Sequence, residues 1–342
     1  MIKETMGNSF ASGKLARGCE LCIRGSKLVL FLTGICQSEC WYCPISEKRK
    51  GKDITWANER EVRSDEDIFE EAKRQSAEGA SITGGEPFLR FDRLLESVRL
   101  FKDNFGHKFH LHLYTYGGLA SPERLRKLDR AELDEIRFHK AENLPDRKEY
   151  SMSVGVEVPL IPGTDKELLA AVDRIAGRAD FLNLNELEYS DSNSDAMMAR
   201  GFEQKNDLSY GIKGSIELGM KILEYADGKV PAHLCPSELK DHIQFRNRLK
   251  RTAKNVRRKY EKETSEGLLL KGVIEGDAAA HRRLLKKFSL SPEYFVFDSE
   301  KGQIEASETI ARRLAGKIAE KAFIVEEYPT FGRLEAERAP LN

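Results

Sequence analysis

The sequence predicts an α/β protein in which a partial or full (β/α) barrel is followed by a small α+β domain. Between residues 28 and 236, short apolar runs alternate about six times with amphipathic segments of helical period. Near residue 236 this alternation ends and a more basic pattern begins. Repeated βα units imply parallel strands with helices outside them. With 342 residues, the chain is long enough for a barrel and an appended domain.

Each barrel element follows from its local pattern. Runs of β-branched and apolar residues predict strands, and amphipathic segments behind capping residues such as Ser64 and Ser121 predict helices. The polar segment 190–209 is expected to be a loop over one rim of the barrel. The expected strands are 28–33, 80–83, 108–115, 135–139, 153–160, 181–187 and 230–234, and the expected helices are 64–78, 91–105, one that opens at 121, 166–176 and 215–225.

These patterns divide the chain into three parts. Residues 1–27 form an N-terminal segment with a cysteine pair, residues 28–236 form the barrel, and residues 237–342 form the α+β domain. This last part opens with a long basic helix over 237–260. Further helices are expected at 278–288 and 307–319, with strands at 268–274, 294–297, 303–305, 322–327 and 333–338.

The composition limits the class of protein. Hydrophobic residues make up 40% of the chain and charged residues 33%, which is typical of a folded protein with a solvated surface. The longest apolar run, 28–38, has about eleven residues, against the ~20 that a membrane helix needs, and the N-terminus lacks a signal peptide. A cytoplasmic protein is therefore expected. Because 56 basic residues balance 56 acidic ones, no global charge favours a nucleic acid or a membrane.

Cysteine spacing carries the strongest chemical signal. Five of the six cysteines lie between residues 19 and 43, and a reducing compartment argues against disulfides. Cys36, Cys40 and Cys43 follow the first barrel strand with the spacing C-x3-C-x2-C. Three thiolates on a [4Fe–4S] cluster leave one iron open for chemistry, whereas a structural zinc site normally takes four ligands. The triplet therefore favours an open iron–sulfur cluster.

With the aromatic Tyr42 before its last cysteine, this triplet resembles the motif of radical S-adenosylmethionine (radical SAM) enzymes. The resemblance implies that Cys36, Cys40 and Cys43 bind a [4Fe–4S] cluster whose fourth iron is chelated by S-adenosylmethionine. Reductive cleavage then gives a 5′-deoxyadenosyl radical that abstracts a hydrogen atom from the substrate. It also implies a barrel of the radical SAM type and a reducing partner such as ferredoxin or flavodoxin.

Later strand ends supply further candidates for S-adenosylmethionine binding. Gly84, Gly85 and Glu86 end the second strand; alone they predict a turn, but they resemble the family's GGE motif, which implies contact with the methionine amino group. Thr115 is similar in position to a residue that contacts the ribose, although a β-branched strand residue explains it nearly as well. Asn185 is placed near the cavity, although strand alternation does not decide which face is inward.

The remaining cysteines suggest a second metal site. Barrel closure would bring Cys19 and Cys22, just before the first strand, near Cys235, just after the last one. These three, with or without His233, would hold either zinc or an auxiliary [4Fe–4S] cluster. The alternative is three reduced thiols, and the sequence does not separate these readings.

The substrate stays open between three classes. The sequence from Thr83 to Pro87 is similar to that of glycyl-radical-enzyme activases. The match is archaeal-looking and falls in the group related to the pyruvate formate-lyase activating enzyme. This resemblance implies that the substrate is a glycine residue of a protein. The basic helix could dock tRNA, although charged faces are usually only solvated. A small molecule or peptide is the third class. The non-enzyme alternatives are an iron–sulfur electron carrier and a zinc-stabilised RNA-binding protein.

Overall fold

The computed structural model describes residues 1–206 and 209–342, which form two compact units. The first unit comprises Met1–Ala72 with Ala77–Phe245, and the second comprises Lys73–Ser76 with Arg246–Asn342. Residues 237–245, which the sequence pattern assigns to the C-terminal domain, belong to the first unit. Leu239 is fully buried there, and both Leu239 and Ile243 pack against Gly7 of the N-terminal segment.

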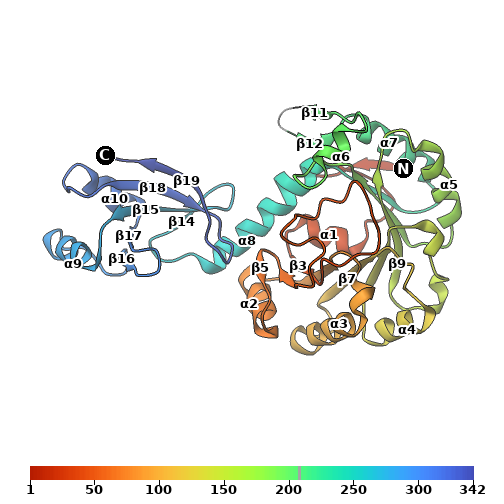
Figure 1. Cartoon of the computed structure of the whole chain (residues 1–342), viewed down its shortest axis with the longest axis horizontal. Coiled ribbons are helices and arrows are strands. Elements are labelled where there is room, and N and C mark those ends of the chain that lie inside the picture. Colours follow the sequence, from red (N-terminus) through yellow and green to blue (C-terminus); the bar gives the residue numbers. More distant parts are fainter. Residues whose placement is uncertain (207–208) are drawn as a thin grey trace. The chain divides into compact units, whose positions relative to one another are not determined.

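Seven parallel strands form the centre of the first unit's sheet (Figure 1). They pair in the order β13-β10-β9-β8-β7-β6-β3. Each of these strands therefore pairs with the one that precedes or follows it in the chain, and the other elements lie in the connections between them. This is the arrangement that the βα alternation predicts. The strands are β3 (Lys27–Phe31), β6 (Gly79–Thr83), β7 (His110–Thr115), β8 (Glu135–Phe138), β9 (Ser153–Leu160), β10 (Phe181–Glu186) and β13 (Ala232–Cys235).

The barrel is open. Within the residues that the structure describes, β3 and β13 are not paired with each other, because an antiparallel pair of short strands borders each of them. On one side these are β2 (Phe10–Ser12) and β1 (Ile2–Glu4), and on the other β4 (Trp56–Ala57) and β5 (Arg60–Glu61). The fold is therefore the partial form of the expected barrel.

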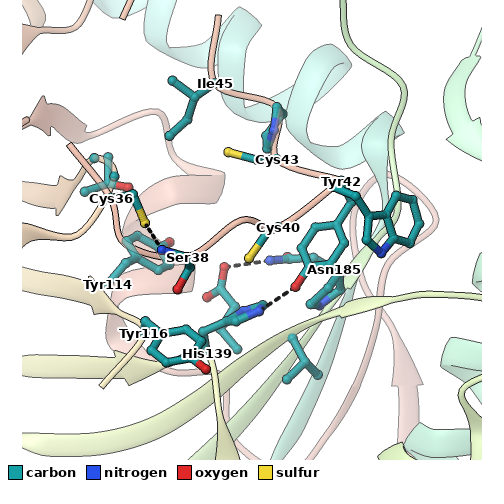
Figure 2. Close-up of a pocket in the computed structure, with 18 of the residues that line it drawn as sticks. Cys36, Ser38, Cys40, Tyr42, Cys43, Ile45, Tyr114, Tyr116, His139 and Asn185 are labelled. Carbon is teal, nitrogen blue, oxygen red and sulfur yellow. Dashed lines mark hydrogen bonds between the residues drawn. The ribbon is translucent and has the colours of Figure 1, made fainter. Parts of the chain in front are cut away.

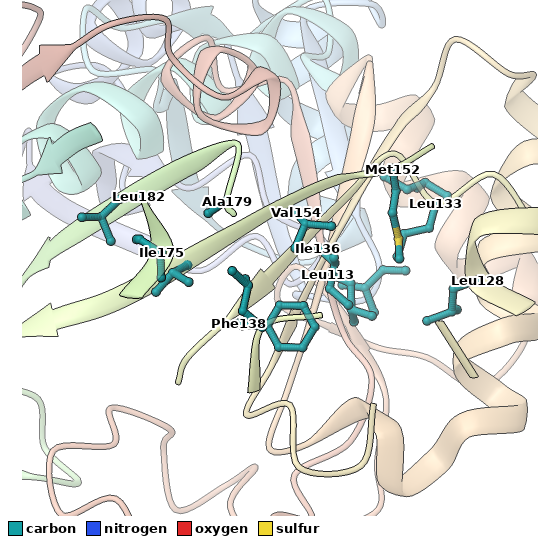
Figure 3. Packing of buried hydrophobic residues seen from close by; sticks show 14 of the residues in the cluster. Leu113, Leu128, Leu133, Ile136, Phe138, Met152, Val154, Ile175, Ala179 and Leu182 are labelled. Atoms are coloured by element: carbon teal, nitrogen blue, oxygen red, sulfur yellow. The ribbon is translucent and has the colours of Figure 1, made fainter. Parts of the chain in front are cut away.

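Helices cover the convex face of the sheet and bury its apolar side chains (Figures 1 and 3). Leu113, Ile136 and Val154 come from three adjacent strands and pack with Leu128 and Ile175 of the covering helices. These helices are α2 (Asp65–Gln75), α3 (Phe91–Phe105), α4 (Pro122–Arg130), α5 (Asp165–Ile175) and α7 (Ser215–Ala226), with short 3-10 turns at Pro87–Arg90, Ala141–Asn143 and Arg147–Glu149. Among the described residues, no helix is long and apolar enough to cross a membrane.

The N-terminal helix α1 (Arg17–Ile23) lies inside the curve of the sheet (Figure 1). Gly18 permits this position, since a Cβ there would lie 2.5 Å from His112 Nδ1 and 2.6 Å from Arg137 Nη2. The Gly18 N–H donates to Glu135 Oε2 at 3.0 Å. Side chains of the strands thus meet the helix backbone directly, and α1 closes part of the space that a completed barrel would have enclosed.

The second unit is built around a β-α-β-β-α-β arrangement of strands and helices. Its antiparallel sheet has the order β16-β17-β15-β18-β19, and β14 also pairs with β15. The helix expected over 237–260 forms as a continuous helical run over residues 237–256, which is π-helical over Leu239–Phe245, where α1 contacts it, and α-helical from Arg246 to Val256. The elements are α8 (Arg246–Val256), β14 (Lys262–Glu263), β15 (Leu269–Glu275), α9 (Ala278–Lys287), β16 (Phe295–Asp298), β17 (Gln303–Ala306), α10 (Glu308–Ala315), β18 (Ala322–Glu327) and β19 (Glu335–Pro340).

Candidate active site

The three cysteines of the triplet lie on one loop at the carboxyl end of β3. All three are free thiols that line a cavity of about 720 Å³, and Figure 2 shows them along its wall. Cys36 is exposed, whereas Cys40 and Cys43 are half-buried. The Ser38 N–H donates to Cys36 Sγ at 3.3 Å, a contact that stabilises a thiolate.

The donor set suits a cluster better than a single ion. In the part of the chain that is described, no three His, Cys, Asp or Glu side chains are close enough together to hold one metal ion, and this includes the triplet. A cubane cluster takes each thiolate at a different iron, so its ligands stand farther apart than those of zinc. Three free thiols on one loop beside a cavity supply three such ligands.

The glycine pair after β6 lies directly against the cysteine loop. A Cβ on Gly85 would clash with the carbonyl oxygen of Ile35 and lie 3.0 Å from Cys36 Cβ. Gly84 has a φ of +151°, and a Cβ on it would clash with the carbonyl oxygen of Thr33. The Gly85 N–H donates to Thr33 O at 2.7 Å, and the Glu86 N–H donates to Ile35 O at 2.8 Å. The pair therefore shapes the cysteine loop as well as the cavity wall.

Glu86 does not line this cavity. It is 1% exposed, and its Oε1 accepts from the Phe88 N–H at 3.0 Å and from Thr115 Oγ1 at 2.9 Å. Its Oε2 accepts from the Tyr116 N–H at 2.7 Å. Burial raises the pKa of Glu86, although these three hydrogen bonds oppose the rise. Glu86 and Thr115 thus form one hydrogen-bonded unit that joins the ends of β6 and β7.

Tyr42 connects the cysteine loop to the end of β8. Its hydroxyl is 2.7 Å from His139 Nε2, and the hydrogen bond is visible in Figure 2. The Tyr116 ring lies against the other side of this histidine. Burial lowers the pKa of His139 and raises that of Tyr42. At neutral pH the pair is therefore a neutral imidazole and a neutral phenol beside Cys40.

The cavity wall across from the cysteine loop is charged but internally paired. Arg137 Nη1 donates to Glu157 Oε2 at 2.6 Å, and Asn185 Nδ2 donates to Glu157 Oε1 at 2.6 Å. Arg137 Nε also donates to Glu135 at 2.6 Å. Asn185 thus lines the cavity. Sequence reasoning missed Arg137, although residues 135–139 alternate Glu135, Arg137 and His139 with Ile136 and Phe138, a pattern that puts three polar side chains on one face of the strand.

A second charged pair in this wall, Lys240 with Glu188, was also missed, and its atoms Nζ and Oε1 are 2.5 Å apart. Lys240 lies in the π-helical stretch Leu239–Phe245, and Glu188 follows β10. The two residues are 52 positions apart in the chain, so sequence spacing does not reveal their contact.

Cys19, Cys22, Cys235 and His233 are not gathered around one ion in the described structure. Cys19 Sγ accepts from Arg137 Nη2 at 3.3 Å, while both ring nitrogens of His233 are engaged, with Asn183 Oδ1 at 2.8 Å and Ser9 Oγ at 3.4 Å. Burial raises the pKa of all three thiols, to about 12 for Cys235. Among the described residues these side chains are not close enough together for one ion, and both the zinc site and the auxiliary [4Fe–4S] cluster stay predictions.

Comparison with known proteins agrees with this geometry. The radical SAM superfamily matches residues 30–139, and a family described as a domain of unknown function matches residues 267–341. A protein of Methanocaldococcus jannaschii that carries the provisional name glycyl-radical enzyme activating enzyme is 40% identical, over 96% of this chain and 93% of the relative.

Two solved structures are more distant. SuiB of Streptococcus suis, bound to S-adenosylmethionine, has 13% identity and a TM-score of 0.41, covering 62% of this chain and 50% of that one. The radical S-adenosylmethionine methyltransferase TsrM of Kitasatospora setae has 16% identity and a TM-score of 0.38, covering 53% and 40%. This chain spans half or less of these two proteins.

An open parallel barrel with three free thiols at its carboxyl edge defines an enzyme that uses an iron–sulfur cluster with an open iron. The chain belongs to the radical SAM superfamily. Its cofactors are a [4Fe–4S] cluster and S-adenosylmethionine, and its reaction is reductive cleavage of S-adenosylmethionine to a radical that abstracts hydrogen. The readings as an electron carrier or a zinc-stabilised RNA-binding protein are set aside by this finding.

The buried Arg137 pair predicts a large loss of stability on substitution. Arg137→Met leaves Glu135 and Glu157 without their cation, and breaking a buried ion pair costs about 3–5 kcal/mol. Urea unfolding at pH 7 measures this loss. Arg126→Met is the matched control, because its ion pair with Glu149 is exposed and contributes about 0–1 kcal/mol. Equal effects of the two substitutions would show that the Arg137 network does not stabilise the fold.

The contact between Gly85 and the cysteine loop predicts a defect in cluster loading. In Gly85→Ala the new methyl group displaces Ile35 and Cys36, so iron bound after anaerobic reconstitution should fall to less than about half of the wild-type value. Gly118→Ala is the control, because a Cβ there meets only Tyr116 at 3.6 Å. Colorimetric iron analysis measures the difference, and normal loading of the Gly85 variant would contradict this role.

Proposed function

We propose that this enzyme activates a protein substrate by abstracting a hydrogen atom from one of its glycine residues. Cys36, Cys40 and Cys43 hold the [4Fe–4S] cluster in this proposal. The observation that carries it is the set of three free thiols on the wall of a cavity of about 720 Å³. Cavities of roughly 300–1,000 Å³ hold ligands the size of a nucleoside cofactor.

The same cavity offers surfaces for S-adenosylmethionine. Gly84 and Gly85 present backbone beside the cysteines, and Tyr42, Thr115 and Asn185 line the wall. Glu86 acts through Thr115 and Tyr116, whose positions it fixes. Apolar side chains, including Ile45, Val158 and Leu187, line the same space and would exclude water from the reacting groups.

A reducing partner, such as ferredoxin or flavodoxin, would supply one electron. When bound and reduced, the cluster with S-adenosylmethionine supplies methionine and a 5′-deoxyadenosyl radical. The glycine Cα–H bond then breaks, the 5′-carbon gains that hydrogen atom, and the unpaired electron stays on the glycine.

Two observations favour a protein glycine over the other substrate classes. The relative that is 40% identical is named as an activating enzyme of glycyl-radical enzymes. In addition, two cations of the cavity wall, Arg137 and Lys240, already pair with Glu157 and Glu188, and Lys50 is a further cation that lines this wall. The paired cations favour a neutral, polar peptide backbone over a phosphate, because a phosphate requires cations that are not already neutralised.

The cluster assignment predicts that Cys40→Ala eliminates the activity. Anaerobically reconstituted wild-type protein should hold about four irons at the triplet and release 5′-deoxyadenosine after dithionite reduction with S-adenosylmethionine. Cys40→Ala removes one of the three ligands and should lose both. Cys235→Ala is the control, since Cys235 does not line the cavity. Iron analysis and liquid chromatography measure the two quantities, and full cleavage by Cys40→Ala would refute the assignment.

The substrate class predicts transfer of deuterium from glycine. Cells of the source organism are grown on glycine deuterated at Cα, and their extract is separated into protein, RNA and small-molecule fractions. With the protein fraction, the 5′-deoxyadenosine formed should gain one deuterium by mass spectrometry, and an unlabelled protein fraction is the control. Turnover stimulated by RNA or small molecules, without deuterium from protein, would overturn the glycine proposal while leaving S-adenosylmethionine cleavage intact.

A further inference from the structure

The segment that follows β10 contacts the cysteine loop. The sequence pattern predicts a loop over 190–209, but the described part contains α6 (Ser194–Met198), β11 (Gln204–Asn206) and β12 (Ser209–Ile212). We call residues 188–202 the rim segment. Its contacts fall on the part of the cysteine loop that runs from Trp41 to Cys43.

Asn193 makes the central contact. It is 1% exposed, and its Nδ2 donates to the Tyr42 carbonyl oxygen at 3.0 Å and to the Glu188 carbonyl oxygen at 3.0 Å. Its Oδ1 accepts from the Ser190 N–H at 2.8 Å. Both N–H groups and the oxygen of this buried amide are therefore used, and one N–H holds the peptide bond that joins Tyr42 to Cys43.

Further contacts hold the neighbouring residues of the loop. Ser192 Oγ donates to the Cys43 carbonyl oxygen at 3.3 Å. The Trp41 ring stacks on Phe202, with centroids 5.5 Å apart and planes 7° apart, and the Arg200 guanidinium lies 4.5 Å from the Trp41 centroid. The Trp41 and Tyr42 side chains also pack on a small apolar cluster whose buried members are Leu187, Met197 and Ile212.

The cysteine loop depends on such contacts because residues 36–44 lie outside every helix and strand described. The Cys36 half of the loop is held by the glycine pair after β6, through the bond from Glu86 N–H to Ile35 O. The half with Cys40 and Cys43 contacts the rim segment instead. Two separate parts of the barrel rim therefore set the relative positions of the three thiols.

We infer that Asn193 is a positioning residue for the cluster: its amide fixes the Tyr42–Cys43 peptide, so that Cys40 and Cys43 are held in place relative to Cys36 before iron binds. This inference rests on the proposed role of the three cysteines. A loop that is ordered in advance loses less conformational freedom when its ligands are occupied, and it holds them more tightly.

Three variants separate positioning from a merely local structural role. Asn193→Asp keeps an oxygen that accepts from the Ser190 N–H but removes both N–H donors. Asn193→Ala removes all three hydrogen bonds. Asn104→Ala is the matched control, because its Nδ2 donates to a single carbonyl oxygen, that of Leu100 on α3, away from the cavity.

The first measurement uses metal-free, reduced protein, so it does not depend on the cofactor. The rates at which iodoacetamide alkylates Cys36, Cys40 and Cys43 are followed by mass spectrometry. Both Asn193 variants should react roughly fivefold faster than wild type at Cys40 and Cys43, the change expected for the loss of one net hydrogen bond. The rate at Cys36 and all rates in Asn104→Ala should match wild type.

The second measurement uses the reconstituted holoenzyme. Iron loss to an excess of chelator should be several-fold faster in both Asn193 variants, and the electron paramagnetic resonance spectrum of the reduced cluster should broaden. Equal thermal unfolding temperatures of the metal-free proteins confirm that the fold is kept. If the Asn193 variants do not fold, Phe202→Leu, which removes the stack on Trp41, takes their place with the same expected changes.

The outcomes distinguish this inference from the proposed function. If Asn193→Asp behaves like wild type in both measurements, Asn193 only shapes the turn at Ser190 and the inference is overturned. If wild-type protein binds no cluster, or Cys40→Ala binds one, the proposed ligands are wrong. Alkylation rates that rise at all three cysteines alike would also overturn the inference, because the effect would then be general loosening.

Discussion

The active site depends on direct backbone contact between the cysteine loop and its neighbours. An irregular loop has no ladder of hydrogen bonds to fix it, so its thiols keep their places only if other segments hold it. At one end the glycine pair after β6 lies so close to Ile35 and Cys36 that no side chain fits between them. At the other end, Asn193 and Phe202 hold the peptide and the rings between Cys40 and Cys43. The open parallel sheet places both at its carboxyl edge, where side chains from many strands converge.

Inside the barrel, charge pairing sets what the cavity can accept. Arg137 is 2% exposed and contacts Glu135, Glu157 and the thiol of Cys19. This one cation therefore contacts both helix α1 and the cavity wall. Burial alone would raise the pKa of Glu135, but Arg137 together with the Gly18 N–H lowers it below its ordinary value. The carboxylate therefore stays ionised, and the stability that it contributes is present above its ordinary pKa and is lost only as the pH falls through the lowered one.

Much of the fold could be predicted from the sequence, because parallel strands and amphipathic helices leave periodic patterns. The helix expected over 91–105 has these bounds in α3, and all seven strands of the parallel sheet lie within two residues of their expected starts. The long helix expected over 237–260 forms over 237–256, but its π-helical stretch Leu239–Phe245 was not expected, because it accompanies tertiary contacts of Leu239 and Ile243 with Gly7. The sequence does not predict whether the barrel closes. It stays open because short strands such as β2 and β4 border its edges, and strands this short leave almost no periodic pattern in the sequence.

The site was predictable where the chemistry lies in one local motif and unpredictable where it depends on distant partners. Cys36, Cys40, Cys43 and Gly85 lie in two short motifs, and the structure places them together. Asn193 lies 151 positions from Tyr42, in a segment whose Ser, Asp and Asn content predicts only a loop. Glu86 shows the converse: its motif was found, yet its carboxylate bonds to Thr115 and to backbone N–H groups instead of lining the cavity. A motif indicates which residues gather at a site, whereas the hydrogen-bond partners of each residue decide what it does there.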